Sequence, residues 1–493
     1  MTEITKLKIS ELIQALKTKK ISSFEITKAY LDRIKKYDEK LNSYILLCEE
    51  QVLKAAKLSD ENYKNNIARN LEGIPLGIKD LFCTKNVKTT ACSHILDGFI
   101  PPYESTVTDN LWNDGALLLG KLNMDEFAMG STNLNSYNGK VINPVKKSNS
   151  DEELVPGGSS GGSAAALAAD FCAASLGSDT GGSVRQPAAF CGVVGIKPTY
   201  GRCSRYGMIA YASSLDQAGI FARDVQDAGI VLNSISSYDE KDSTSCKQKS
   251  EDFLQDLNKG IKGMKIGLPK EYEMEGMNPD IKKNIEESVK KLEELGAEII
   301  EVSLPHTHYG APTYYILSTA EASSNLARYD GVRYGLRVSD KGDSLEDLYK
   351  NTRASGFGNE VKRRIMLGTY VLSSGYYDAY YRKAQKVRRL IANDFDNVFN
   401  KVDAIITPTT PNTAFGNQQK LSNVETYYND VFTVPVNLAG LPAISIPVGV
   451  DSNNLPIGVQ FITPKFSEAK MLRIAKSLED EVGFDRYKLN FRF

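Results

Sequence analysis

Lys79 stands in an otherwise apolar run of the sequence, and its side chain could serve as a base. Strand alternation places Lys79 on the opposite face from Ile74, Leu76 and Ile78. Burial in such a strand disfavours the ammonium form and lowers the pKa of the side chain, which is what a lysine base requires. The alternative is a lysine at a strand end that pairs with Asp80 at the surface.

Two segments rich in glycine and serine follow, at residues 157–163 and 177–183. The alanine-rich stretch 164–169 comes directly after the first segment and favours a helix, so we expect a tight loop at a helix start instead of a flexible linker. Such a loop presents serine hydroxyls and backbone amides that can bind an anion or relay a proton. It lacks the lysine of a phosphate-binding P-loop, and G-x-G-x-x-G is not satisfied.

The second segment predicts a strand, a sharp turn at Gly181-Gly182, and then Ser183 where a helix begins. Consecutive small residues let several backbone N–H groups point at one spot, which is how an oxyanion hole forms beside a nucleophile. A serine nucleophile is weak and needs an adjacent base. The alternative is that Ser183 is only the N-cap of the helix.

Histidine is a poorly supported base, because the chain has three histidines and none lies in a recognisable triad motif. His306 and His308 are separated by one residue, but no carboxylate or cysteine at ligand spacing accompanies them, so we expect no metal site. We expect a structural role for these two and for His94.

Composition and charge exclude several classes of protein. The formal charge is −1, which gives no bulk electrostatic case for nucleic-acid binding by this chain alone, although a local basic patch at 362–364 stays open. The seven cysteines are odd in number and form no C-x-x-C, which is typical of reduced thiols in a cytoplasmic protein. No apolar run reaches the length of a membrane span, and the first residues lack a secretory apolar region.

The elements that must position these residues predict an α/β protein. Residues 1–65 are expected to be helical and to pack on the core, with a helix cap at Ser22–Glu25. We expect residues 66–493 to form one globular unit with a polar surface connection near 236–262, which includes a short helix near Phe253. Later strands are expected at 264–268, 298–302, 402–408, 443–448 and 458–462, and helices at 280–295, over most of 311–400, and at 468–481.

Lys79 and the two glycine-serine segments together resemble the amidase signature family, in their order and in the 24-residue interval from Ser159 to Ser183. The resemblance implies a central mixed β-sheet flanked by helices on both faces. It also implies that Ser183 is the nucleophile and forms an acyl-enzyme. Ser159, in a cis peptide, would relay the proton to the base Lys79. The backbone amides of Thr180, Gly181, Gly182 and Ser183 would hold the oxyanion.

Three further stretches are similar to the glutaminase subunits of the tRNA-dependent amidotransferases that convert Glu-tRNA(Gln) to Gln-tRNA(Gln). They are residues 314–331, 356–381 and 428–435. The resemblance implies that Tyr314, Arg363 and Asp430 bind glutamine. Arg363 would pair with the α-carboxylate, Asp430 with the α-ammonium, and Tyr314 would add a hydrogen bond. The neighbouring Arg364 is an alternative carboxylate ligand, and a surface or interhelical ion pair is the alternative role for all three residues.

The same resemblance implies a heterotrimer, in which this chain works with a larger tRNA-binding partner and a small bracing partner. The larger partner would use ATP and Mg²⁺ to activate the misacylated end and would receive ammonia through an internal channel. No cofactor is expected on this chain. Two other functions stay open: a stand-alone amidase acting on small amides, and a catalytically inactive scaffold protein, against which the intact lysine and two serines argue.

Overall fold

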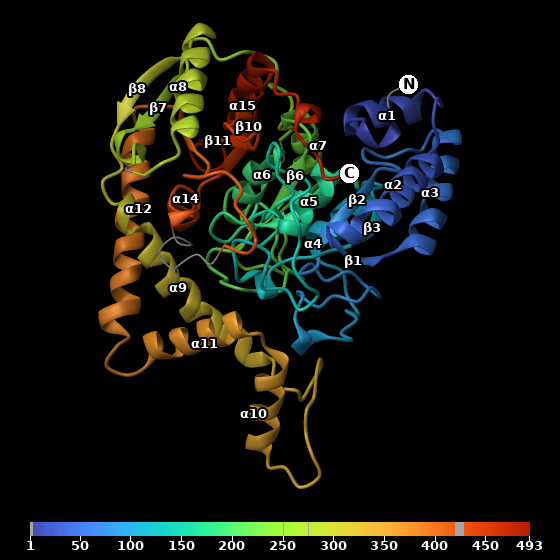
Figure 1. Ribbon diagram of the computed structural model, residues 1–493, viewed down its shortest axis with the longest axis vertical. Coiled ribbons are helices and arrows are strands. Elements are labelled where there is room, and N and C mark those ends of the chain that lie inside the picture. Colours follow the sequence, from blue (N-terminus) through green and yellow to red (C-terminus); the bar gives the residue numbers. More distant parts are fainter. Residues whose placement is uncertain (1–2, 250, 275, 420–427) are drawn as a thin grey trace.

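A mixed β-sheet of eleven strands forms the centre of the protein (Figure 1) in the computed structural model, which describes residues 3–249, 251–274, 276–419 and 428–493. The strand order is β1-β3-β2-β4-β6-β5-β10-β11-β9-β7-β8. The strands are β1 (Tyr44–Leu47), β2 (Pro75–Lys79), β3 (Leu117–Leu122), β4 (Ala174–Ser178), β5 (Val194–Lys197), β6 (Ala218–Ala222), β7 (Lys265–Pro269), β8 (Glu298–Val302), β9 (Ala404–Pro408), β10 (Ala443–Val450) and β11 (Pro456–Ile462).

Both parallel and antiparallel pairs occur in this sheet. Strand β2 runs parallel to both of its neighbours, β3 and β4, and β7 runs parallel to β8 and β9. The remaining neighbours are antiparallel. Strands β2, β4 and β5 are buried along their whole length, so they read as continuous apolar or small-residue runs. The α/β class and the mixed sheet expected from the sequence are confirmed.

Helices flank the sheet along its length (Figure 1). Figure 1 also shows α10 projecting away from the body of the molecule, beyond α9 and α11. The helices are α1 (Ile9–Lys17), α2 (Ser23–Tyr37), α3 (Glu49–Lys64), α4 (Thr106–Asn113), α5 (Gly161–Ala168), α6 (Arg185–Cys191), α7 (Val225–Ile235), α8 (Pro279–Glu294), α9 (Gly310–Asn325), α10 (Leu345–Gly356), α11 (Asn359–Leu372), α12 (Lys383–Phe399), α14 (Val434–Ala439) and α15 (Glu468–Val482).

The N-terminal segment contains a strand as well as the expected helices. Helix α2 begins as predicted, because the Ser22 side chain accepts a hydrogen bond from the backbone N–H of Glu25 and the Glu25 carboxylate bonds back to Ser22. The expectation of helix throughout residues 1–65 was wrong at Tyr44–Leu47, which pairs antiparallel with β3. This strand has only four residues between two helices, which is too short for its pattern to be separated from theirs.

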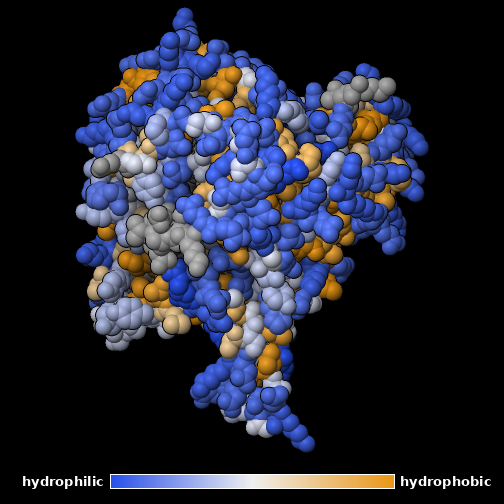
Figure 2. Space-filling model, viewed as in Figure 1, coloured by the Kyte–Doolittle hydropathy of each residue, from blue (hydrophilic) through white to orange (hydrophobic). Residues whose placement is uncertain are grey.

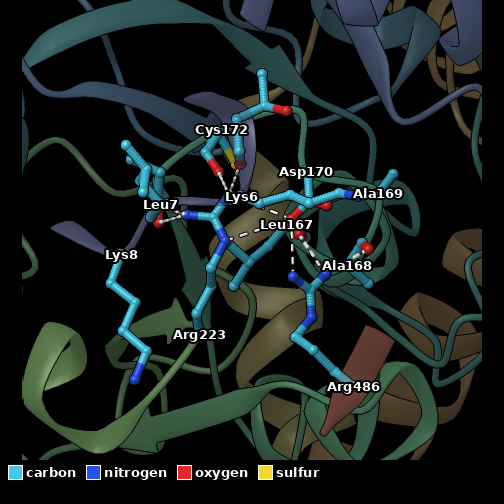
Figure 3. Close-up of polar contacts among 12 residues, drawn as sticks. Lys6, Leu7, Lys8, Leu167, Ala168, Ala169, Asp170, Cys172, Arg223 and Arg486 are labelled. Carbon is cyan, nitrogen blue, oxygen red and sulfur yellow. Dashed lines mark hydrogen bonds and ion pairs between the residues drawn. The ribbon is translucent and has the colours of Figure 1, made fainter. Parts of the chain in front are cut away.

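A buried cluster of charges ties the N-terminal segment to the core (Figure 3). Asp170 forms an ion pair with Arg486 at 2.7 Å and another with Arg223 at 3.4 Å. Arg223 also donates to the carbonyls of Thr5, at 2.7 Å, and Leu7, at 3.0 Å. Because these carbonyls precede α1, a single guanidinium joins the chain start to the loop after α5 and the end of β6.

Later elements follow the sequence expectations closely, with one exception. Strands β7 to β11 and helices α8 and α15 lie within two residues of their expected bounds, apart from two longer strand ends. The short helix expected near Phe253 was wrong, because residues 253–258 form turns. The side chain of Phe253 is nevertheless buried in the core, so its apolar character marks packing and not a helix.

The face of the molecule in Figure 2 is mainly hydrophilic, with apolar residues gathered in small patches. Within the described part of the chain, no helix combines the length and the apolar character needed to cross a membrane.

Candidate functional site

Lys79 lies at the end of β2, in the interior of the molecule. Its Nζ atom lies 2.8 Å from each of three serine hydroxyls, those of Ser159, Ser160 and Ser178. Ser178 reaches it because β2 and β4 are parallel and in register, with Ile78 opposite Leu176, so both strands end at the same edge. The side chain is fully buried, which rules out the alternative of a surface lysine paired with Asp80.

Burial decides the protonation of Lys79. Desolvation lowers the pKa of the ammonium group to about 7, although the carboxylates of Asp125 and Asp179 oppose the shift. The group is therefore poised between its neutral and charged forms near neutral pH, which is the range in which a general base works best. A lysine with an ordinary pKa would be almost entirely protonated there.

The loop that carries Ser159 is held on several sides. The peptide bond between Gly158 and Ser159 is cis. The amide of Gly158 donates to the Gln186 side chain at 3.0 Å, and the carbonyl of Ser159 accepts from the amide of Asp125 at 3.1 Å. A Cβ atom on Gly158 would lie 2.2 Å from the Asp125 carboxylate, so a residue with a side chain cannot replace this glycine without displacing the loop.

A buried ion pair shapes the loop that carries Ser183. The Asp179 carboxylate receives two hydrogen bonds from the Arg185 guanidinium, both at 3.0 Å. It also accepts from the amides of Gly182, at 2.8 Å, and Val184, at 3.2 Å. The positive charge of Arg185 holds the pKa of Asp179 well below its usual range. Asp179 therefore stays ionised and fixes the turn around Ser183.

Ser183 lies between this turn and α6, with 8% of its surface exposed. It is not the N-cap of the helix, because α6 begins at Arg185 and its cap residue is Val184. In the described part of the chain, the Ser183 hydroxyl makes no hydrogen bond with another protein group, so it is available to a substrate.

The backbone amides around Ser183 divide into two groups. Those of Thr180, Gly181 and Ser183 make no hydrogen bond to another described residue, and three such donors on one turn can face an incoming oxyanion. Gly182 departs from the expectation, because its amide already donates to Asp179. The donor set available in this structure is therefore Thr180, Gly181 and Ser183.

Two of the expected glutamine-binding residues lie against the same turn. A Cβ atom on Gly181 would lie 2.8 Å from the ring of Tyr314, so α9 contacts the turn directly. The Thr433 hydroxyl donates to the carbonyl of Gly181 at 2.7 Å, and the Thr433 amide donates to the carbonyl of Asp430 at 3.1 Å. The structure thus gathers Tyr314 and Asp430 around the turn that carries Ser183, although they are far from it in the sequence.

Arg363 and Arg364 differ in the surroundings of their guanidinium groups. Both pair with Glu360, at 2.8 Å and 2.7 Å. Arg364 is buried and also donates to the Tyr211 hydroxyl at 2.7 Å. The Arg363 side chain is 39% exposed. Exposure makes Arg363 the more accessible carboxylate ligand, whereas Arg364 is part of the packing between α11 and the core.

Sequence reasoning missed several residues of this site. Ser160 and Ser178 were part of the quoted segments, but nothing local distinguishes them from other serines. Asp179 also lay in the second segment, and a buried acidic residue beside two glycines could have been singled out as a loop anchor. Asp125 and Thr433 carry no signal in their own surroundings.

The histidines lie elsewhere. His306 pairs with Asp394 at 3.0 Å, His94 stacks on Tyr137, and His308 packs against the ring of Tyr309. Among the residues that the structure describes, no group of three or more histidine, cysteine, aspartate or glutamate side chains could hold a metal ion.

Comparison with known proteins adds to this geometry. The family model described as Amidase matches residues 25–472. The A chain of the glutamyl-tRNA(Gln) amidotransferase of Bartonella henselae is 58% identical over 487 residues, which are 98% of each chain, and that of Pelagibacter ubique is 57% identical over 485 residues, again 98% of each.

Solved structures show the same likeness. The crystal structure of the corresponding amidotransferase chain from Thermotoga maritima superposes with a TM-score of 0.79 at 40% identity, covering 97% of this chain and 96% of that one. The native peptide amidase of Stenotrophomonas maltophilia superposes with a TM-score of 0.84 at 29% identity, covering 99% of each chain.

Proposed function

The chain belongs to the amidase signature family, and from this premise we propose that it is the glutaminase component of an amidotransferase that converts Glu-tRNA(Gln) to Gln-tRNA(Gln). The observation that carries the proposal is the fully buried Lys79 amine, 2.8 Å from the Ser159 hydroxyl, in a chain 58% identical to its counterpart in a glutamyl-tRNA(Gln) amidotransferase. The peptide amidase is half as similar in sequence, which favours glutamine over other amides.

In the proposed reaction, Ser183 attacks the side-chain amide carbon of glutamine. Neutral Lys79 takes a proton from Ser159, and Ser159 takes the proton of Ser183 as its oxygen bonds to the carbon. The amides of Thr180, Gly181 and Ser183 hold the oxygen that becomes negative. Nearby carboxylates, those of Asp125 and Asp179 above all, favour the ammonium form that Lys79 adopts at this stage.

The proton then returns along the same path to the departing nitrogen. Ammonia leaves, and a γ-glutamyl ester remains on Ser183. Water attacks the ester with Lys79 again accepting a proton through Ser159. Glutamate leaves and the Ser183 hydroxyl is restored, so one glutamine and one water yield one glutamate and one ammonia.

Recognition of glutamine is assigned to the three residues that converge from α9, α11 and the segment before α14. Arg363 pairs with the α-carboxylate, in a geometry that a guanidinium can make bidentate. Asp430 pairs with the α-ammonium, and the Tyr314 hydroxyl adds a hydrogen bond. Arg364 supports Arg363 through the Glu360 carboxylate that both of them contact.

We assign the remaining chemistry to two partners in a heterotrimer. The larger partner binds tRNA, uses ATP and Mg²⁺ to activate the glutamyl end, and receives the ammonia, while the small partner braces the complex. The near-zero formal charge of this chain, −1, fits a complex in which tRNA is held mainly by the larger partner. A function in translation implies that the complex is cytoplasmic.

Trapping of the acyl-enzyme tests this proposal. The chain is purified with the proteins that accompany it and incubated with glutamine and increasing hydroxylamine. A γ-glutamyl ester on Ser183 partitions between water and hydroxylamine, so γ-glutamyl hydroxamate should increase while glutamate decreases. Glutamate release that is insensitive to hydroxylamine, with no glutamyl adduct on the peptide containing Ser183, would contradict the covalent mechanism.

A further inference from the structure

A short segment, residues 211–216 between β5 and β6, contacts the turn that carries Ser183. We call it the linking segment. Its last residue, Asp216, is 3% exposed and accepts a hydrogen bond from the Thr180 hydroxyl at 2.7 Å. The second oxygen of this carboxylate accepts from the amides of Tyr211, at 2.9 Å, and Ala212, at 3.0 Å. Asp216 therefore joins the oxyanion turn to the first residues of the linking segment.

The other end of the linking segment contacts α11. The Tyr211 hydroxyl accepts a hydrogen bond from the Arg364 guanidinium at 2.7 Å, and this guanidinium also lies over the Tyr211 ring, 5.5 Å from its centroid. Arg364 shares the Glu360 carboxylate with Arg363. The contacts are thus continuous from Thr180, whose amide is assigned to the oxyanion, to Arg363, which is assigned to the glutamine carboxylate.

Contacts with α9 and α12 hold the middle of the linking segment. Glu321 of α9 accepts from the Ser214 amide at 2.8 Å and from the Ser214 hydroxyl at 2.6 Å. Arg388 of α12 donates to the Ser214 hydroxyl at 2.8 Å and to its carbonyl at 3.0 Å. Fixed at its centre, the segment cannot shift at one end without straining contacts at the other.

We propose that the linking segment positions the oxyanion turn against the glutamine-binding helix, with Asp216 and Tyr211 as positioning residues for the reaction. The inference rests on the proposed glutaminase function and names what keeps its two halves in register. Asp216 orients Thr180, and Tyr211 orients Arg364 and, through Glu360, Arg363. The turn is then competent only when α11 is seated, which favours an amide whose carboxylate binds Arg363.

The Thr180 hydroxyl gives the first test, because Thr180→Val removes it and leaves the backbone amide in place. We expect kcat for glutamine hydrolysis by the assembled enzyme to fall about tenfold with KM within about twofold, since one orienting hydrogen bond is lost. Thr180→Ser, which keeps a hydroxyl, should recover most of the rate. Thr413→Val is a matched control, because the Thr413 hydroxyl donates to a buried aspartate, Asp451, at the same distance of 2.7 Å, away from this site.

A double-mutant cycle gives the second test. Tyr211→Phe removes only the hydroxyl that accepts from Arg364, and we expect it to raise KM for glutamine several-fold and to lower kcat. Because both changes break one chain of contacts, Thr180→Val combined with Tyr211→Phe should cost less than the product of the single effects. Effects that multiply would show independent contacts and overturn the proposal, as would single variants with wild-type kinetics or a control that loses as much kcat as Thr180→Val.

The outcome is separable from that of the proposed function. If Ser183→Ala still releases glutamate from glutamine, the nucleophile assignment fails whatever the linking segment does. If Ser183→Ala is inactive and the double-mutant cycle is multiplicative, the glutaminase assignment stands and the positioning role is wrong.

Discussion

The Nζ atom of Lys79 and the Oγ atom of Ser159 lie 2.8 Å apart with both side chains fully buried. Two more serine hydroxyls, those of Ser160 and Ser178, surround the same amine at the same distance. An amine in such surroundings exchanges protons with hydroxyl groups without water between them. This contact is the physical basis of the proposed mechanism, in which lysine replaces histidine as the base.

The pH dependence of kcat should report the protonation of Lys79. Desolvation lowers the pKa of Lys79 to about 7, and only the neutral amine accepts a proton. We therefore expect kcat for glutamine to rise with pH up to about 7 and then to level, with a one-proton slope on the acid side. A kcat independent of pH between about 6 and 8 would contradict the lysine base.

The pH dependence of KM should report Asp430 instead. Burial raises the pKa of this carboxyl to about 7, so it is largely protonated in the unliganded enzyme below that pH. The α-ammonium of glutamine requires the ionised form, and we expect KM to increase as the pH falls below about 7. Asp430→Asn should raise KM at every pH and remove this dependence, and a mutant that keeps the slope would assign it to another group.

Exchange of the two neighbouring arginines should separate their functions. Arg363→Lys keeps the charge but loses the planar fork, so KM for glutamine should rise about tenfold or more with little change in thermal stability. Arg364→Lys should lower the melting temperature, because this guanidinium is buried against Tyr211 and Glu360. The reverse pattern would make Arg364 the carboxylate ligand. Melting curves and steady-state kinetics of both variants decide between the two.

The sequence predicted most of the local features of this site and few of its distant contacts. The alternation around Lys79 indicated a buried strand, and the glycine and alanine runs indicated the loop before α5 and the turn near α6. These signals are local, because backbone conformation depends on adjacent residues. Tyr314 and Asp430 could be named only from resemblance.

Contacts between distant segments explain what was missed. Asp216 meets Thr180 across 36 residues, and Thr433 meets Gly181 across 252. Neither aspartate nor threonine has a local pattern that reveals such a partner. The strand at Tyr44–Leu47 was missed for a related reason, because it exists through its pairing with β3 and not through its own four residues.

The buried cluster in Figure 3 gives a prediction about stability. Arg223→Met leaves Asp170 with one fewer cation and frees the carbonyls of Thr5 and Leu7. We expect the free energy of unfolding to fall by about 3–5 kcal/mol, as when one partner of a buried ion pair is removed. Exposed Arg382, which pairs with Asp378 on the surface, is a suitable control, and Arg382→Met should cost less than about 1 kcal/mol. Equal losses in denaturant unfolding would contradict a structural role for the cluster.

The most direct measurement of the central claim compares two nitrogen donors in the assembled amidotransferase carrying Ser183→Ala. Conversion of Glu-tRNA(Gln) with glutamine as donor should fall about a thousandfold or more, because no acyl-enzyme can form. Conversion with added ammonia should stay close to that of the wild type, since the partner's chemistry is untouched. Glutamine-dependent conversion that survives the substitution would show that Ser183 is not the nucleophile.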